Sequence, residues 1–143
     1  NMYEYSCKVK KVVDGDTIDV VLDLGFDILH KSRVRLYGID TPESRTRNLD
    51  EKARGKMAGA FLKDAIKNGD KVVIQTKLKD SRGKFGRVLG DVVVDGVNIN
   101  KALVENNYAV AYHGQSKEDV EEEHQINRTK LIERGLFTPE ESK

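Results

Sequence analysis

Three short segments of the chain place acidic or basic side chains beside glycine or proline. Asp14–Thr17 reads DGDT, Arg35–Glu43 reads RLYGIDTPE, and Gly83–Arg87 reads GKFGR. Carboxylate oxygens are ligands that hard divalent cations prefer, and a guanidinium group binds two phosphate oxygens at once. The three segments could therefore hold a cation and a phosphodiester if the fold brings them together.

Each segment also has an ordinary structural interpretation. Asp14 and Asp16 flank a glycine, and such residues commonly form Asx turns that fix a hairpin. Glu43 follows a proline, where a solvated surface acid is common. Taken one at a time, the segments favour this interpretation, and we retain it for Asp14.

The first 39 residues contain three strand-like runs, and the third of them overlaps the second segment. Residues 5–13 and 17–26 are rich in β-branched side chains and are separated by the turn signal DGD. Apolar residues alternate in the second run, as in a half-buried antiparallel hairpin. A third alternating run covers residues 33–39 and places Arg33 and Arg35 on a common face.

The period then becomes helical. Apolar residues recur at helical spacing through residues 51–68, after Asn48 or Asp50 as the N-cap, and a glycine follows the run. Gly55 and Gly59 interrupt this helix. Each costs about 1 kcal/mol relative to alanine, so we expect both to pack closely against the sheet.

The second half of the chain predicts two more strands and two helices. The strands cover residues 71–78 and 87–94, a short helix follows Asn98 as its cap, and a charged helix covers about 116–134. The residues of this last helix available for burial are Val120, Ile126, Leu131 and Ile132. This order of elements predicts an α+β domain on a small antiparallel sheet, which closes readily into a barrel.

Barrel closure is our condition for a site. Asp16 lies in the first hairpin turn, and Asp40 lies just past the third strand. We expect a flat three-stranded meander to separate these two acids. A curled sheet or a staggered pairing would then be needed to bring them to one end.

Charge is distributed unevenly along a chain whose formal net charge is +1. Residues 30–47 contain five Lys or Arg against two acids, residues 71–87 contain six against one, and residues 117–143 contain eight acids against five bases. A basic patch formed by the first two regions could attract a polyanion. A solvated surface of mixed charge is the alternative.

Length and composition fit one domain of 143 residues. We assign residues 2–143 to it, with Met2 as the native start and Asn1 as a remnant added for expression. A domain of this size needs no metal or disulfide to fold, so a bound metal would serve function. Cys7 is the only cysteine, and we interpret it as a small buried apolar residue.

The sequence predicts neither a membrane span nor an export signal. No run approaches the roughly 18 consecutive apolar residues that a transmembrane helix needs, and no charged start precedes an apolar stretch. We therefore expect a cytoplasmic protein with no membrane partner. A secreted form whose signal has been removed is the alternative.

In order and spacing, the three segments resemble the signature segments of the staphylococcal nuclease, or thermonuclease, family. The similarity continues through Asn100–Tyr112, which reads NKALVENNYAVAY. The resemblance implies an OB fold, in which a five-stranded antiparallel barrel carries three helices. No single segment is specific to the family, but the three segments together, in this order and spacing, are.

The resemblance also implies a Ca²⁺ site. Asp16 and Asp40 would supply carboxylate ligands and Thr41 its backbone carbonyl. Three protein oxygens leave positions for water and a substrate phosphate, because Ca²⁺ takes six to eight ligands. Mg²⁺ and Mn²⁺ remain alternatives.

Three further positions match the catalytic residues of the family. Arg35 and Arg87 would bracket the phosphate, and their guanidinium groups would neutralise its charge in the five-coordinate state. Glu43 would position the attacking water, either as a general base or as an organiser of water and loop. Arg33 matches no catalytic position, and we interpret it as a surface or phosphate-steering residue.

The resemblance implies nucleotide binding by Lys84, Phe85 and Tyr112. Phe85 stands where the best-known member has a tyrosine, so stacking could survive while a hydroxyl contact is lost. We interpret His113 and His124 as solvated or capping residues, because neither has a histidine or cysteine partner at metal spacing.

The function implied is a monomeric, Ca²⁺-dependent endonuclease that cuts DNA and RNA with little sequence specificity. Water would attack in line and leave 3′-phosphate ends, with single-stranded or locally open substrates favoured. The alternative is a non-catalytic OB-fold module that binds nucleic acid or protein. The presence of the whole catalytic and ligand set favours the enzyme.

Overall fold

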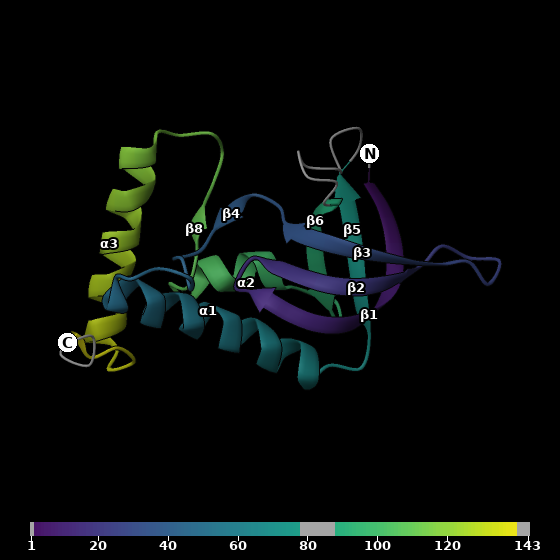
Figure 1. The fold of residues 1–143 in the computed structure, drawn as a ribbon, viewed down its shortest axis with the longest axis horizontal. Helices are drawn as coiled ribbons and strands as arrows, with labels where there is room; N and C mark the ends of the chain where they lie inside the picture. Colours follow the sequence, from purple (N-terminus) through teal and green to yellow (C-terminus); the bar gives the residue numbers. More distant parts are fainter. Residues whose placement is uncertain (1, 78–87, 140–143) are drawn as a thin grey trace.

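Five strands form a barrel, two helices pack against it, and a third helix lies farther out at one end of the molecule (Figure 1). The structure is a computed structural model that describes residues 2–77 and 88–139. The barrel strands are β1 (Met2–Asp14), β2 (Thr17–Asp23), β3 (Leu29–Leu36), β5 (Val72–Lys77) and β6 (Val88–Val94). The helices are α1 (Leu49–Lys67), α2 (Ile99–Glu105) and α3 (Lys117–Glu133). Three two-residue strands complete the described elements: β4 (Ile39–Asp40), β7 (Val97–Asn98) and β8 (Val110–Ala111).

The barrel closes through a parallel pairing of β3 with β6, in which Val34 lies opposite Val88. The other neighbours are antiparallel, in the order β3-β2-β1-β5-β6. The long strand β1 pairs with β5 through its first half and with β2 through its second. Register shifts after Val9 and Val12 increase its twist, as β-bulges do. The predicted five-stranded OB fold with three helices is confirmed.

Alternate residues of the strands fill the barrel, as the period of two predicted. The buried inner residues include Ile18, Val20, Leu22, Val34, Leu36, Ile74 and Val92. Helix α1 adds Ala58 and Leu62, and α2 adds Ile99 and Leu103. The Cys7 side chain is partly buried against this core, and its burial raises the pKa of the thiol to about 11.

The helix starts follow the expected capping chemistry. The Asn48 side chain accepts a hydrogen bond from the Glu51 amide at 3.0 Å and caps α1. Asn98 caps α2 in the same way through the Lys101 amide. The two asparagines therefore fix where the chain turns from loop into helix.

Helix α3 buries few apolar residues. Leu131 is buried as predicted, but Ile126 is exposed, so the prediction for Ile126 was wrong. A polar contact also attaches α3 to α1: Arg128 forms an ion pair with Asp50 at 2.9 Å. Burial alone would raise the pKa of Asp50, but hydrogen bonds from Arg128 and Arg54 outweigh it and lower the pKa.

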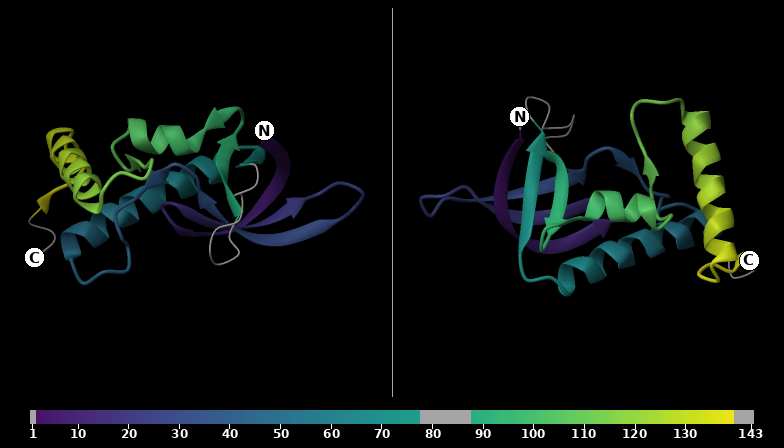
Figure 2. Two further views of the ribbon diagram at one scale, coloured as in Figure 1. Left: turned by 90° about the horizontal axis from the view of Figure 1, so that it is seen from above. Right: turned by 180° about the vertical axis from the view of Figure 1, so that it is seen from behind.

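Figure 2 shows that α3 and the β2–β3 hairpin lie at opposite ends of the molecule. The hairpin projects beyond the barrel, while α3 crosses the N-terminal end of α1. Within residues 2–77 and 88–139, no helix combines the length and apolar character needed to cross a membrane.

Candidate active site

Strand pairing brings Asp16 beside Arg35. Thr17 lies opposite Arg35 in the β2–β3 ladder, and the Leu36 amide donates to the Asp16 carbonyl at 2.7 Å. The expectation that a flat meander would separate the first turn from the end of β3 was wrong. In antiparallel strands β2 begins where β3 ends, so pairing alone places both at one end of the sheet.

A two-stranded ladder outside the barrel positions Asp40. Gly38 adopts a φ of 76°, which favours glycine, and turns the chain from β3 into β4. In β4, Asp40 pairs with Val110 of β8. The Tyr112 amide donates to the Gly38 carbonyl at 2.8 Å and extends this ladder.

The Arg35 guanidinium bridges the two aspartates. Its Nη1 lies 3.3 Å from Asp16 Oδ2, and its Nη2 lies 3.9 Å from Asp40 Oδ1. The same Nη1 also donates to the Leu36 carbonyl at 3.0 Å. Two carboxylates that are 24 residues apart in the sequence therefore face one positive group.

Two threonines hold the Asp16 carboxylate. Thr17 Oγ1 donates to Oδ1 at 3.0 Å, and Thr41 Oγ1 donates to Oδ2 at 3.1 Å. Thr41 is buried, so its hydroxyl has a fixed partner. These contacts join the first turn to the segment after β4.

A cavity of about 470 Å³ opens beside this network. Five of the predicted site residues line it: Arg35, Asp40, Thr41, Glu43 and Tyr112. The remaining residues of its wall had no site role predicted from the sequence: Glu51, Gln115, Lys117, Val120, Glu121 and His124. Asp16 is not in the wall and lies behind Arg35 and Thr41. The predicted residues Lys84, Phe85 and Arg87 lie outside the described residues.

His124 was wrongly interpreted as solvated or capping. Its side chain is 7% exposed, and its Nε2 lies 2.8 Å from Asp40 Oδ2. A signal was present in the sequence, because His124 follows Val120 by four residues and precedes Leu131 by seven, on the inward face of α3. His113 is exposed, as expected.

The loop that carries Glu43 packs directly on α1. The Glu43 amide donates to Glu51 Oε2 at 3.1 Å. Ser44 Oγ donates to Asp14 Oδ1, so Asp14 ties the first turn to this loop. Partial burial, and then repulsion from Asp16 and other nearby acids, raises the pKa of Glu43 above its usual value.

Gly55 allows this packing and Gly59 does not take part in it. A Cβ at Gly55 would lie 2.6 Å from the Pro42 carbonyl oxygen and 2.8 Å from the Glu43 carbonyl carbon. A Cβ at Gly59 would meet nothing closer than 3.8 Å. We predicted that both glycines pack closely against the sheet: Gly55 does pack closely, but against the loop, and the prediction for Gly59 was wrong.

Alanine at these two glycines should have opposite effects on stability. We expect Gly59→Ala to raise the free energy of unfolding by up to about 1 kcal/mol, because alanine favours the helix. Gly55→Ala should lower it by about 1–3 kcal/mol, because backbone must shift to admit the methyl group. Urea unfolding of both variants measures the difference. Equal stabilisation by the two would contradict the contact.

The residues present fit a hard divalent cation. All candidate donors are oxygens. Burial is the largest cause of the raised pKa of Glu43, and repulsion from Asp16, Asp14 and Asp40 adds to it, a repulsion that a cation would relieve. Among the described residues, no three His, Cys, Asp or Glu side chains are arranged to hold a metal by themselves. A cation here would therefore take ligands from backbone, water and substrate as well.

The closed five-stranded barrel with three helices makes this an OB-fold domain of the α+β class. The chain belongs to the staphylococcal nuclease family, since residues 33–132 match the family described as "Staphylococcal nuclease homologue".

Two bacterial relatives illustrate this membership. The chain is 33% identical over 103 residues to endonuclease YncB of Bacillus subtilis, covering 71% of this chain and 46% of the relative. It is 36% identical over 103 residues to a thermonuclease of Staphylococcus intermedius, covering 72% and 57%. The chain thus spans only about half the length of these relatives.

Proposed function

We propose that this chain is a Ca²⁺-dependent nuclease that hydrolyses phosphodiester bonds in DNA and RNA. The observation that carries the proposal is the Arg35 guanidinium between Asp16 and Asp40 at the edge of an open cavity. The names of the relatives, an endonuclease and a thermonuclease, support it.

In this proposal Asp16, Asp40 and the Thr41 carbonyl hold the cation. When bound, Ca²⁺ would act as a Lewis acid toward a phosphate oxygen. His124 fixes one oxygen of Asp40 and leaves Oδ1 facing Arg35. The protein supplies only part of the coordination shell, which leaves room for the substrate.

The side chains that line the cavity perform the remaining steps. Arg35 donates to the phosphate oxygens and neutralises their charge as the phosphorus becomes five-coordinate. Glu43 accepts a hydrogen bond from the attacking water and aligns it. A bond forms between the water oxygen and phosphorus, the bond from phosphorus to the 5′-oxygen breaks, the attacking water gives up a proton to solvent, and the leaving 5′-oxygen takes a proton from solvent. The products are a 3′-phosphate and a 5′-hydroxyl.

Low sequence specificity follows from the contacts proposed. Tyr112 is 48% exposed in the cavity wall and offers a ring for base stacking. Stacking and phosphate contacts do not read base edges, and an unpaired base stacks most easily. Lys84, Phe85 and Arg87 keep in this proposal the roles that the family resemblance implies.

Incubation of the protein with heat-denatured DNA tests the proposal. We expect cleavage with Ca²⁺, none with excess chelator, and 3′-phosphate ends that block extension by a polymerase until a phosphatase removes them. Parallel incubations with Mg²⁺ and Mn²⁺ test the choice of cation. Binding that weakens with salt but never yields cleavage would instead support the non-catalytic module.

Removing the His124 side chain should weaken Ca²⁺ binding. Mutation of a residue that orients a metal ligand typically lowers the metal affinity by about 10-fold to 100-fold. We expect a loss of about 10-fold in Ca²⁺ affinity for His124→Ala. His124→Gln retains a donor toward Asp40 and should recover part of the loss. Isothermal titration with Ca²⁺ measures this without any activity assay, and exposed His113→Ala is the control. Unchanged affinity in His124→Ala would refute the positioning role.

A further inference from the structure

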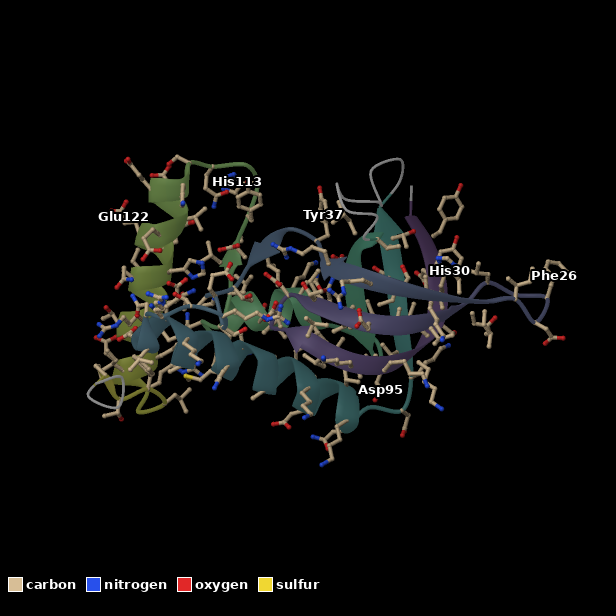
Figure 3. The ribbon with its side chains drawn as sticks, in the orientation of Figure 1. Phe26, His30, Tyr37, Asp95, His113 and Glu122 are labelled. Carbon is tan, nitrogen blue, oxygen red and sulfur yellow. The ribbon has the colours of Figure 1, made fainter. Side chains whose placement is uncertain are left out.

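The tip of the β2–β3 hairpin exposes apolar side chains far from the candidate active site. Phe26 is 97% exposed, and Leu29, Ile28 and Leu24 are exposed beside it. Figure 3 shows Phe26 at the outer end of the hairpin, at the other end of the molecule from Glu122 on α3. A surface of this kind is unusual in a small protein and commonly marks a binding site.

The backbone holds Phe26 in this exposed position. Phe26 and Asp27 adopt φ values of 54° and 63°, in the left-handed region that is costly for residues with a Cβ. The Leu24 amide donates to the Ile28 carbonyl, and the Ile28 amide donates to the Gly25 carbonyl, both at 2.9 Å. The loop is thus a closed turn that presents the ring outward.

Basic side chains connect this tip to Arg35. The alternation of β3 places Lys31 and Arg33 on the same face as Arg35, with about 6.6 Å between successive members. Lys8 joins them across the sheet, because Val21 pairs with Lys8 on one side and with Lys31 on the other. We call the face formed by Lys8, Lys10, Lys31 and Arg33 the outer basic face.

The charges of the outer basic face are largely available to a ligand. Arg33 is held by Asp19 at 2.8 Å. Lys8, Lys10 and Lys31 form no ion pair with any residue in the described ranges. Two shallow cavities of about 460 and 400 Å³ lie on this face, and both are lined by Lys10.

We propose that the outer basic face and Phe26 form an extended binding site for single-stranded nucleic acid. Phosphates of a strand that enters at Arg35 would follow Arg33, Lys31 and Lys8, and a base would stack on Phe26. The side-chain repeat of a strand is close to the phosphate spacing of an extended single strand, which favours this occupant. Continuity with the Arg35 cavity favours it over a lipid or protein partner.

This inference rests on the proposed function, and it predicts a dependence on substrate length. Leu29, the first residue of β3, lies six residues from Arg35, or about 20 Å along the strand, and Phe26 lies beyond it in the turn. A dinucleotide at the cavity cannot reach the tip, whereas an oligonucleotide of twenty residues can. The site should therefore raise affinity only for the longer ligand.

Fluorescence anisotropy with labelled oligothymidylate of two and of twenty nucleotides, in excess chelator to prevent cleavage, tests the proposal. For the 20-mer we expect Lys8→Glu/Lys31→Glu to weaken binding by at least about tenfold and to reduce the salt slope by about 1.4 or more, since each lost single-strand contact removes about 0.7. Phe26→Ala should weaken it about fivefold or more. Dinucleotide binding should change less than about twofold, since neither variant reaches the cavity.

The control variant Lys56→Glu/Lys63→Glu makes the same charge change on the exposed face of α1. Equal loss in control and test variants, or equal loss for both ligand lengths, would overturn the proposal. Unchanged 20-mer affinity would also overturn it. Binding to phosphatidylserine vesicles is measured in parallel, and a Phe26→Ala variant that loses only vesicle binding would overturn the proposal in favour of a lipid partner. Dinucleotide cleavage with Ca²⁺ is measured separately. Its absence in the wild-type protein would count against the proposed function and leave the binding result standing.

Discussion

Replacing Asp40 by alanine should abolish Ca²⁺-dependent cleavage while the barrel remains folded. The residue supplies one of the two candidate carboxylate ligands, and its Oδ1 and Oδ2 face Arg35 and His124. Removal of a group that stabilises the transition state typically costs 10²-fold to 10³-fold, and loss of the cation as well should cost at least about 10³-fold. Asp40 lies outside the apolar core, so its loss need not unfold the protein.

Cleavage rates, Ca²⁺ titration calorimetry and thermal unfolding of Asp40→Ala check this prediction together. Asp64→Ala removes an exposed carboxylate from α1 and serves as the matched control. We expect the control to keep both activity and Ca²⁺ affinity. An Asp40→Ala protein that is folded and still cleaves at a near-normal rate would refute the assignment of Asp40. An unfolded one would show that the residue is structural.

Arg35→Lys should lower kcat by about a hundredfold or more, although it conserves the charge. A guanidinium presents a planar fork that spans two oxygens, whereas an ammonium is a point charge on a flexible stem. In the structure one Arg35 side chain reaches Asp16, Asp40 and the Leu36 carbonyl together. Lysine cannot make this set of contacts at once.

Steady-state kinetics on a dinucleotide substrate separates the effect on kcat from that on KM. A loss mainly in kcat would assign Arg35 to the transition state, and a loss only in KM would assign it to substrate binding. Arg47→Lys, at an exposed position in the loop that precedes α1, provides the control. Near-normal turnover in Arg35→Lys would contradict the argument from the guanidinium fork.

Local sequence patterns predicted the elements that build the barrel. Alternation of apolar residues places Ile18 and Val34 inside, and the side-chain amides of Asn48 and Asn98 start two helices. These features depend on a few neighbouring residues, so the sequence is sufficient to predict them. The position of Arg35 opposite the first turn also follows from antiparallel order, although our expectation that a flat meander would separate Asp16 from Asp40 missed this.

The long-range contacts of the site were not predictable in the same way. Strands β4 and β8 contain two residues each, which is too short to show a period. Asp40 and His124 are 84 residues apart, and their contact depends on how α3 docks. That docking relies on Arg128 and Asp50 rather than on an apolar stripe, so hydrophobic periodicity carries little information about it.

Anomalous diffraction from a crystal soaked in Ca²⁺ locates the cation independently of activity. We predict one strong peak within the usual oxygen coordination distance, about 2.3–2.6 Å, of the Asp16 and Asp40 carboxylates and the Thr41 carbonyl. A peak elsewhere in the molecule, or none at this position in a protein that cleaves DNA with Ca²⁺, would contradict it.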